Sequence, residues 1–412
     1  MGNTNITEFD GGVTAPKGFK AAGVAAGIKY TNRKDMAMIF SQSPCVVAGC
    51  FTTNVVKAAP VKWDMDIVEN SPAVHGVVVN SGIANAATGQ PGMEVCKKTA
   101  DFVAKSFDIL PNAVLIGSTG VIGNQIPIDR IENGISALKD LLSDTRQAAN
   151  DAEHAIMTTD TVPKEIAVKV NIGGKEVTVG GMSKGSGMIH PNMCTMLAYI
   201  CTDCNITKEM LTKVAKTDIP DTFNMITVDG DTSTNDTYLI MANGLAENPV
   251  IDKEGDDFNA FMDAVHYVNE SLAKKMAKDG EGATALFEVK VVNADTKENA
   301  KILAKSVAGS SLCKAAIFGH DSNFGRFLCA LGYSGADFDP EKVSLKYVSR
   351  AGEAEIFAKG LMVPYDEAEA TKILSEDEIT VVCDMDMGNA EATAWGCDLS
   401  YDYVKINADY RS

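Results

Sequence analysis

The sequence has few basic residues for its length. Lysine and arginine number 37 against 55 aspartates and glutamates in 412 residues, which gives a formal net charge of -18. No basic run offsets this excess, so the chain repels phosphate backbones and anionic lipid surfaces. We therefore expect neither a nucleic acid nor a membrane as its partner.

Targeting features are also missing from the first twelve residues, MGNTNITEFDGG. They contain no basic segment followed by an apolar stretch, and Ile6 stands where a myristoylation signal needs Ser or Thr. The ten cysteines are scattered, unlike the dense framework of a small secreted domain. These observations predict a protein of the reducing cytoplasm.

The signals for a metal site are weak. Cys201 and Cys204 form a C-x-x-C pair, but a zinc ribbon needs a second pair and the sequence has none. Residues 228–236 resemble the opening of an EF-hand calcium loop, yet Thr234 and Ile240 occupy the positions that require glycine and glutamate. We expect buried thiols, a turn capped by Asx and Ser/Thr side chains, and no bound metal.

The length and a hydrophobic fraction of 45% predict two or three domains with sizeable cores. In the first part, short β-branched runs predict buried strands at 48–54, 76–80 and 113–116. Apolar residues at helical spacing predict helices at 94–107, 131–142 and 258–278.

A second series of elements begins near residue 285, which predicts a smaller C-terminal α+β domain behind an α/β core. A helix is expected at 296–307, and strands are expected at 286–292, 315–318, 343–347 and 378–383. The last segment, 392–407, alternates again and is expected to return to the main sheet.

The stretch KGSGMIHPNMCT, from Lys184 to Thr195, holds the best candidate for a nucleophile. A threonine hydroxyl reacts poorly until a base takes its proton, and an N-terminal threonine can use its own α-amine as that base. This chemistry requires the chain to be cut between Cys194 and Thr195.

A glycine-punctuated turn, 117–123, directly follows a predicted strand. Its backbone N–H groups could cradle a phosphate, or the Thr119 hydroxyl and the Gly120 amide could bind an oxyanion; a plain tight turn is the third reading. The G-x-x-G-x-x-G spacing differs from the G-x-G-x-x-G of dinucleotide sites, which disfavours a nucleotide.

Ser183 is a rival nucleophile, because residues 181–185 match the G-x-S-x-G elbow of α/β-hydrolases. Such a triad would need a downstream histidine, and His266 and His320 are available. His266, however, lies on a helical apolar stripe, where a core histidine with satisfied hydrogen bonds is the better interpretation.

Long motifs then resemble one family almost from end to end, the ornithine acetyltransferases, or glutamate N-acetyltransferases, of arginine biosynthesis. The motifs are GIKYTNRKDMAMIFS, FTTNVVKAAPV, VNSGIANAATG, STGVIG, MTTDTVPK, KGSGMIHPNMCTML, DGDTSTNDT, GEGAT and ATAWGCDLSYDYVKINADYRS. The resemblance implies a precursor that cuts itself before Thr195 into an α chain, 1–194, and a β chain, 195–412. Residues 195–284 would complete the catalytic core, 285–390 would form the smaller domain, and 391–412 would return to the active site.

The resemblance also implies the reaction. The acetyl group of N2-acetylornithine would move to the Thr195 hydroxyl and then to glutamate, with no cofactor or metal. Whether acetyl-CoA serves as a second donor stays open. Thr119 and Gly120 would form the oxyanion hole, and the implied substrate contacts are Thr158 or its neighbour Thr159, Lys184, Thr195, Glu281, Asn407 and Ser412.

By the same resemblance, the fold is an αββα sandwich like that of N-terminal-nucleophile hydrolases, assembled as an α2β2 heterotetramer. A self-processing aminopeptidase and a non-enzymatic binding protein on the same scaffold are the alternatives. Two departures from the family pattern stand out: Cys194 replaces a common alanine, and 320–326 reads HDSNFGR where RDPNWGR is usual.

Overall fold

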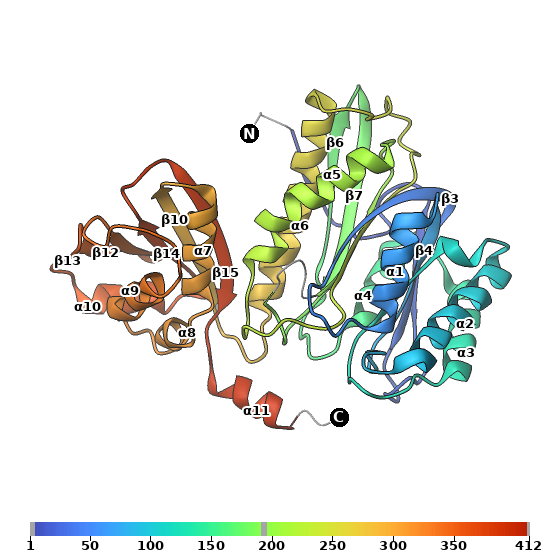
Figure 1. Cartoon of the computed structure of the whole chain (residues 1–412), viewed down its shortest axis with the longest axis horizontal. Helices are drawn as coiled ribbons and strands as arrows, with labels where there is room; N and C mark the ends of the chain where they lie inside the picture. The colour runs from blue at the N-terminus through green and yellow to red at the C-terminus, as the bar shows by residue number, and fades with distance from the viewer. Residues whose placement is uncertain (1–4, 191–195, 410–412) are drawn as a thin grey trace.

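The computed structural model describes residues 5–190 and 196–409. Two β-sheets dominate it, and the long helix α6 (Asp256–Lys278) lies between them. In Figure 1 the larger sheet and its helices occupy the right of the molecule, and the smaller sheet lies on the left. The expected α/β architecture with a smaller C-terminal α+β unit is confirmed.

The larger sheet has nine strands in the order β1-β6-β7-β8-β9-β3-β4-β5, with β2 paired to β3. Their bounds are Thr7–Phe9 (β1), Phe19–Val24 (β2), Met36–Phe51 (β3), Val74–Asn80 (β4), Val114–Ser118 (β5), Glu165–Ile172 (β6), Lys175–Lys184 (β7), Leu197–Thr202 (β8) and Thr237–Ala242 (β9). The helices of this part are Ala59–Asn70 (α1), Gly89–Phe107 (α2), Ile128–Leu141 (α3), Arg146–Ile156 (α4) and Lys208–Asp218 (α5), with single turns at Pro111–Ala113 (η1), Ile219–Asp221 (η2) and Phe223–Met225 (η3).

Strand β3 folds this sheet into two layers. Its first half pairs with β2 and β4, and its second half pairs with β9. Because side chains alternate along a strand, Ala37 and Ile39 enter a core between the layers, whereas Met36 and Met38 face outward. Helices α2 and α3 cover one outer face, α5 and α6 cover the other, and α4 contributes to the core between the layers. This is the αββα arrangement that was expected.

Helix α6 matches the periodic segment predicted at 258–278. Its buried residues face two ways, since the same hydrophobic core contains residues of β6 and β7 and residues of the smaller sheet. Asp256 and Asp257 lie in its first turn and Lys275 and Lys278 in its last, the charge distribution that the helix dipole favours.

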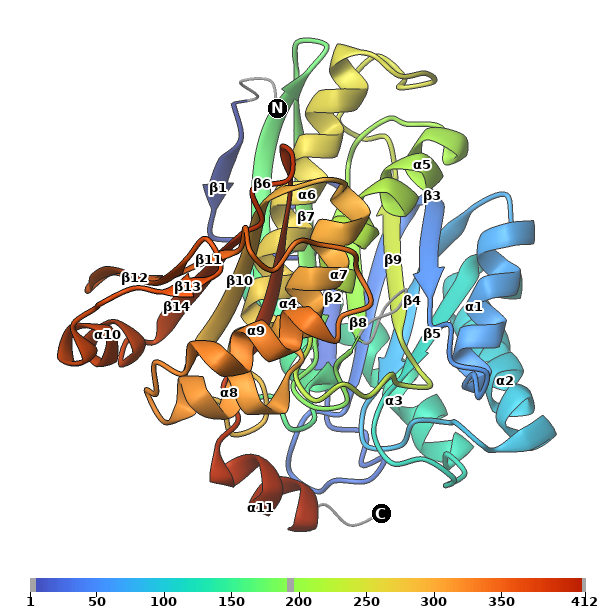
Figure 2. The same cartoon turned by 60° about the vertical axis from the view of Figure 1, so that its left-hand side comes forward.

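The smaller sheet has six strands in the order β13-β12-β11-β14-β10-β15. They are Leu286–Ala294 (β10), Ser344–Ser349 (β11), Gly352–Ala358 (β12), Leu361–Met362 (β13), Glu378–Asp384 (β14) and Ala390–Cys397 (β15). Its helices are Lys297–Ala308 (α7), Ser311–Phe318 (α8), Phe324–Gly332 (α9) and Glu367–Leu374 (α10). Figure 2 shows this unit in front of the larger sheet.

Two expectations for this unit are wrong. Residues 315–318 are the last part of helix α8 rather than a strand, because Ser310 caps a helix through the Cys313 N–H. Residues 390–397 pair antiparallel with β10 in the smaller sheet and do not return to the larger one. Only the following helix, α11 (Tyr401–Asp409), leaves this unit.

Candidate active site

A cavity of about 160 Å³ lies at the edge of the larger sheet where the ends of β5, β7, β8 and β9 meet. The predicted site residues that line it are Thr119, Gly120, Thr158, Thr159, Lys184, Glu281 and Asn407. Met196 and Leu197, which follow Thr195 in the chain, also line it. The cavity thus brings together every predicted site residue that the structure describes. Cys194, Thr195 and Ser412 lie outside the described residues.

The turn after β5 is held tightly against a second glycine-containing loop. Thr119 N–H donates to the Asn80 carbonyl at 3.0 Å. Gly120 has a φ of +129°, and a Cβ there would lie 2.3 Å from the Gly82 carbonyl carbon. The buried amide of Asn235 donates to the Ser118 carbonyl at 2.8 Å from the other side. The turn is therefore a fixed part of the cavity wall, as a preorganised donor must be.

Lys184 ends β7 and supplies a cation to the cavity. Its Nζ lies 3.9 Å from Oδ2 of Asp160, a buried carboxylate that also accepts hydrogen bonds from Thr158 N–H at 2.9 Å and Gly185 N–H at 2.7 Å. Burial alone would raise the pKa of Asp160, but the ammonium groups of Lys184 and Lys164 hold that pKa well below its usual range. Asp160 is therefore ionised at neutral pH.

Arg33 fixes the segment that carries Thr158. Its guanidinium donates to the Met157 carbonyl at 2.6 Å and reaches the Thr158 carbonyl at 3.5 Å, and it stacks on the ring of Tyr30. With Asp160 holding the Thr158 N–H, this part of the cavity wall is fixed on both sides.

Glu281 gives the cavity a carboxylate. Its N–H donates to the Ser186 carbonyl at 3.0 Å, and Asn407 of α11 donates to its Oε2 at 2.7 Å. A Cβ on Gly187 would lie 2.4 Å from the Glu281 carboxyl carbon, so only glycine lets this side chain rest there. Lys184 and Glu281 thus give the cavity an ammonium group and a carboxylate, two groups that suit an amino acid with a charged side chain; Asp236 is a further acidic residue of the lining.

Residues 228–236, which resemble the opening of an EF-hand loop in sequence, hold the chain at Met188 and Ile189 in place beside the cavity. Ser233 Oγ caps Asn235 N–H at 3.1 Å, as the predicted turn required. In addition, Asp229 accepts hydrogen bonds from Met188 N–H at 2.6 Å and Ile189 N–H at 2.9 Å. The segment therefore fixes the chain that leads toward Thr195.

The structure disfavours the serine nucleophile. Ser183 is fully buried in β7, and its hydroxyl has no hydrogen-bond partner among the described residues. His266 Nδ1 lies 2.6 Å from Asp218, which confirms the satisfied hydrogen bond, although the side chain is half-buried rather than in the core. His320 is exposed at the end of α8, and neither histidine lines the cavity.

Cys201 and Cys204 are free and buried, and burial raises the pKa of both thiols. Within residues 5–190 and 196–409, no cluster of three or more His, Cys, Asp or Glu side chains is arranged to hold a metal ion. Over the same residues, no helix has the length and apolar character needed to cross a bilayer.

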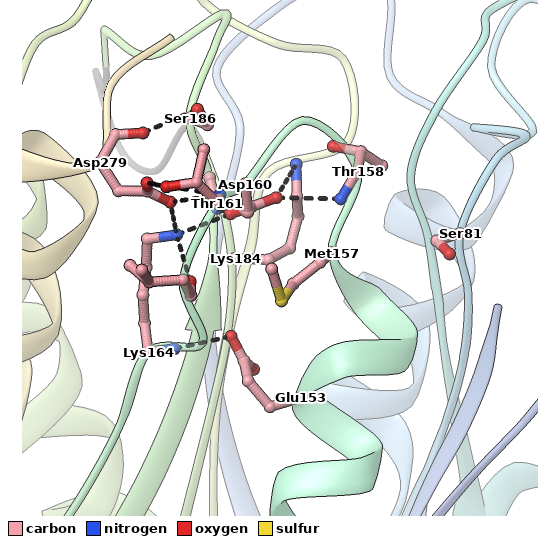
Figure 3. A network of polar contacts seen from close by, with 12 residues as sticks. Ser81, Glu153, Met157, Thr158, Asp160, Thr161, Lys164, Lys184, Ser186 and Asp279 are labelled. Carbon is pink, nitrogen blue, oxygen red and sulfur yellow. Dashed lines mark hydrogen bonds and ion pairs between the residues drawn. The ribbon is translucent and has the colours of Figure 1, made fainter. Parts of the chain in front are cut away.

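Sequence reasoning missed three charged residues beside the cavity: Asp160, Lys164 and Asp279. Figure 3 shows their ion pairs and hydrogen bonds to the left of Lys184 and Thr158. Lys164 Nζ lies 2.8 Å from Asp160 and 2.6 Å from Asp279, and its side chain is fully buried. Asp160 and Lys164 stand in the MTTDTVPK motif, but only the fold shows that Asp279, 115 residues away, completes the group.

Comparison with known proteins agrees with this picture. The model of the ArgJ family matches residues 20–412. The "Arginine biosynthesis bifunctional protein ArgJ 1" of Clostridium acetobutylicum is 49% identical over 412 residues, covering 100% of this chain and 98% of the relative. The "Arginine biosynthesis bifunctional protein ArgJ" of Thermotoga neapolitana is 49% identical over 399 residues, covering 96% and 99%.

Among solved structures, the ornithine acetyltransferase of Mycobacterium tuberculosis, complexed with ornithine, is 38% identical and covers 47% of this chain and 100% of its own, with a TM-score of 0.43. The family assignment rests on the sequence matches, which extend over nearly the whole length of this chain and of both relatives. The chain belongs to the ArgJ family.

Proposed function

We propose that this protein transfers the acetyl group of N2-acetylornithine to glutamate, in arginine biosynthesis, through an ester on Thr195. The observation that carries the proposal is that one cavity contains Lys184, Glu281 and the turn of Thr119 and Gly120, next to Met196. Membership of the ArgJ family supports the same reaction.

The proposed reaction begins with self-cleavage. The Thr195 hydroxyl attacks the Cys194 carbonyl, and the Cys194–Thr195 peptide bond breaks to give an ester and a free Thr195 amine. Water then hydrolyses the ester, which releases the Cys194 carboxylate and restores the hydroxyl. An α-amine has a reference pKa of roughly 7.7 to 8.0, which suits a general base near neutral pH.

Two acyl transfers follow. The Thr195 hydroxyl takes the acetyl group and ornithine leaves; the α-amine of glutamate then attacks the ester, and N-acetylglutamate leaves. Each transfer passes through a tetrahedral oxyanion, for which we propose the Thr119 hydroxyl and the Gly120 N–H as donors.

The charges of the cavity suit these substrates. We propose that Lys184 binds the α-carboxylate and that Glu281 binds the side-chain ammonium of ornithine. The proposed site also includes Thr158 or Thr159, Asn407, which already holds Glu281, and the terminal Ser412.

The proposal includes no cofactor or metal, a cytoplasmic location and an α2β2 assembly. Acetyl-CoA is a candidate second donor, since the relatives are named bifunctional proteins. Supplying N-acetylornithine with glutamate, and acetyl-CoA with glutamate, in separate mixtures tests both donors. Acetylglutamate in the first mixture is the expected result. If neither mixture yields acetylglutamate and the protein instead hydrolyses a peptide substrate, the protein is an aminopeptidase.

A denaturing gel tests the self-cleavage. The wild-type protein should give two chains, and Thr195→Ala should give one. An intact wild-type chain with full transfer activity would refute the N-terminal threonine.

A further inference from the structure

We propose that Lys164 is a positioning residue. It keeps Lys184 free for substrate, and it holds in place the part of the cavity wall that contains Glu281. Lys164 itself does not line the cavity. Its ammonium group lies behind the wall and binds a carboxylate on each side, Asp160 and Asp279 (Figure 3). The inference rests on the function proposed above.

The first contact of Lys164 sets the partners of Asp160. Lys164 Nζ binds Oδ1 at 2.8 Å, and Gly185 N–H donates to the same oxygen at 2.7 Å. Thr158 N–H donates to Oδ2 at 2.9 Å, whereas Lys184 Nζ stays at 3.9 Å, beyond hydrogen-bond distance. Because Lys164 and two backbone N–H groups already donate to this carboxylate, Lys184 makes no hydrogen bond to it and keeps its three donors available in the cavity.

The second contact leads to the opposite wall. Asp279 follows the last residue of α6 and binds Lys164 at 2.6 Å; it also accepts hydrogen bonds from the N–H and hydroxyl of Thr161. Its carbonyl accepts from Ser186 Oγ at 2.7 Å, and the Ser186 carbonyl accepts from Glu281 N–H at 3.0 Å. Lys164 is therefore connected to both Lys184 and Glu281.

The charges in this group balance only when Lys164 is present. Asp160 and Asp279 are matched by Lys164 and Lys184, and burial raises the pKa of the neighbouring Glu153 well above its usual range. Without Lys164, Asp160 would be a buried carboxylate with Lys184 as the nearest cation at 3.9 Å. In a buried site the attraction is strong, so Lys184 would move onto Asp160 and away from substrate.

The test compares Lys164→Met with wild type in the transfer assay, with both KM values, kcat and thermal unfolding measured on the cleaved protein. We expect kcat/KM to fall about 100-fold, as for other small displacements of positioned groups, mainly because the KM values for N-acetylornithine and glutamate rise while kcat changes far less. The matched control is Lys278→Met, which also removes a lysine bound to two carboxylates, Asp377 and Glu378, but at the surface. It should leave both KM values unchanged.

The outcomes separate this inference from the proposed function. A wild-type protein without transfer activity would refute the function. An active wild type together with a folded, cleaved Lys164→Met variant of unchanged KM would overturn the positioning role, even if the variant melts earlier. If Lys164→Met stays uncut, Asp279→Asn replaces it: this variant keeps the cation but weakens the link to Ser186 and Glu281, and unchanged KM values would overturn the inference.

Discussion

Charged residues are used differently in the two sheets of this molecule. Behind the cavity of the larger sheet, Lys164 and Asp160 are fully buried and in contact. On the smaller sheet, Lys346 and Glu353 form a pair of similar length, 3.0 Å, with side chains 37% and 65% exposed. Water and salt screen the second pair but not the first. Burial, not distance, should decide what each pair contributes.

The largest effect is expected from Gly120→Ala, because the added Cβ would displace the backbone of the turn that forms part of the cavity wall. A Cβ would clash with the Gly82 backbone at 2.3 Å and would strain a φ of +129°. We expect the transfer rate to fall about 100- to 1000-fold, as for the loss of one oxyanion donor. Gly123→Ala is the matched control: its φ is +90° but no atom lies within 4 Å of the new Cβ, so most activity should remain.

Breaking the buried ion pair should give the next largest effect. Asp160→Ala removes a partner of the fully buried Lys164, and we expect the free energy of unfolding to fall by about 3 to 5 kcal/mol. Chemical denaturation measures it. A loss below about 1 kcal/mol, the range of surface pairs, would show that this cluster behaves like an exposed one.

An intermediate case is His266, whose ring is partly buried between Asp218 and Glu270. Hydrogen bonds to Asp218 and Glu270 raise its pKa to about 10 from an ordinary 6.5. The pair therefore stabilises the fold fully below pH 6.5, and this contribution is lost as the pH rises through about 10. His266→Gln should remove that part of the pH dependence; denaturation curves at pH 7 and pH 10 that shift alike in both proteins would contradict it.

The smallest effect belongs to the smaller sheet. Lys346→Met removes an exposed partner of Glu353, and the free energy of unfolding should change by less than about 1 kcal/mol. Denaturation at low and at high salt measures it. A larger loss that persists in high salt would erase the contrast between the two sheets.

Sequence reasoning predicted α6 and the short β-branched strands at 76–80 and 113–116, and it failed at 315–318 and for the sheet to which 390–397 belongs. Four apolar residues at 315–318 fit a strand or a helix equally well, and the Ser310 cap decides between them. The cavity residues could be anticipated from family motifs. The contact between Lys164 and Asp279 could not, because it depends on where α6 ends relative to β6.

The segment after α6 belongs to both halves of the molecule. Asp398, at the end of β15, binds the Thr284 N–H at 2.8 Å, and Ser400 Oγ donates to the Gly282 carbonyl at 2.5 Å. Glu281 is thus tied to residues that fold with the smaller sheet, while Lys184 folds with the larger one. Local unfolding of either sheet would dismantle the cavity, so catalytic activity should be lost when the less stable of the two sheets unfolds.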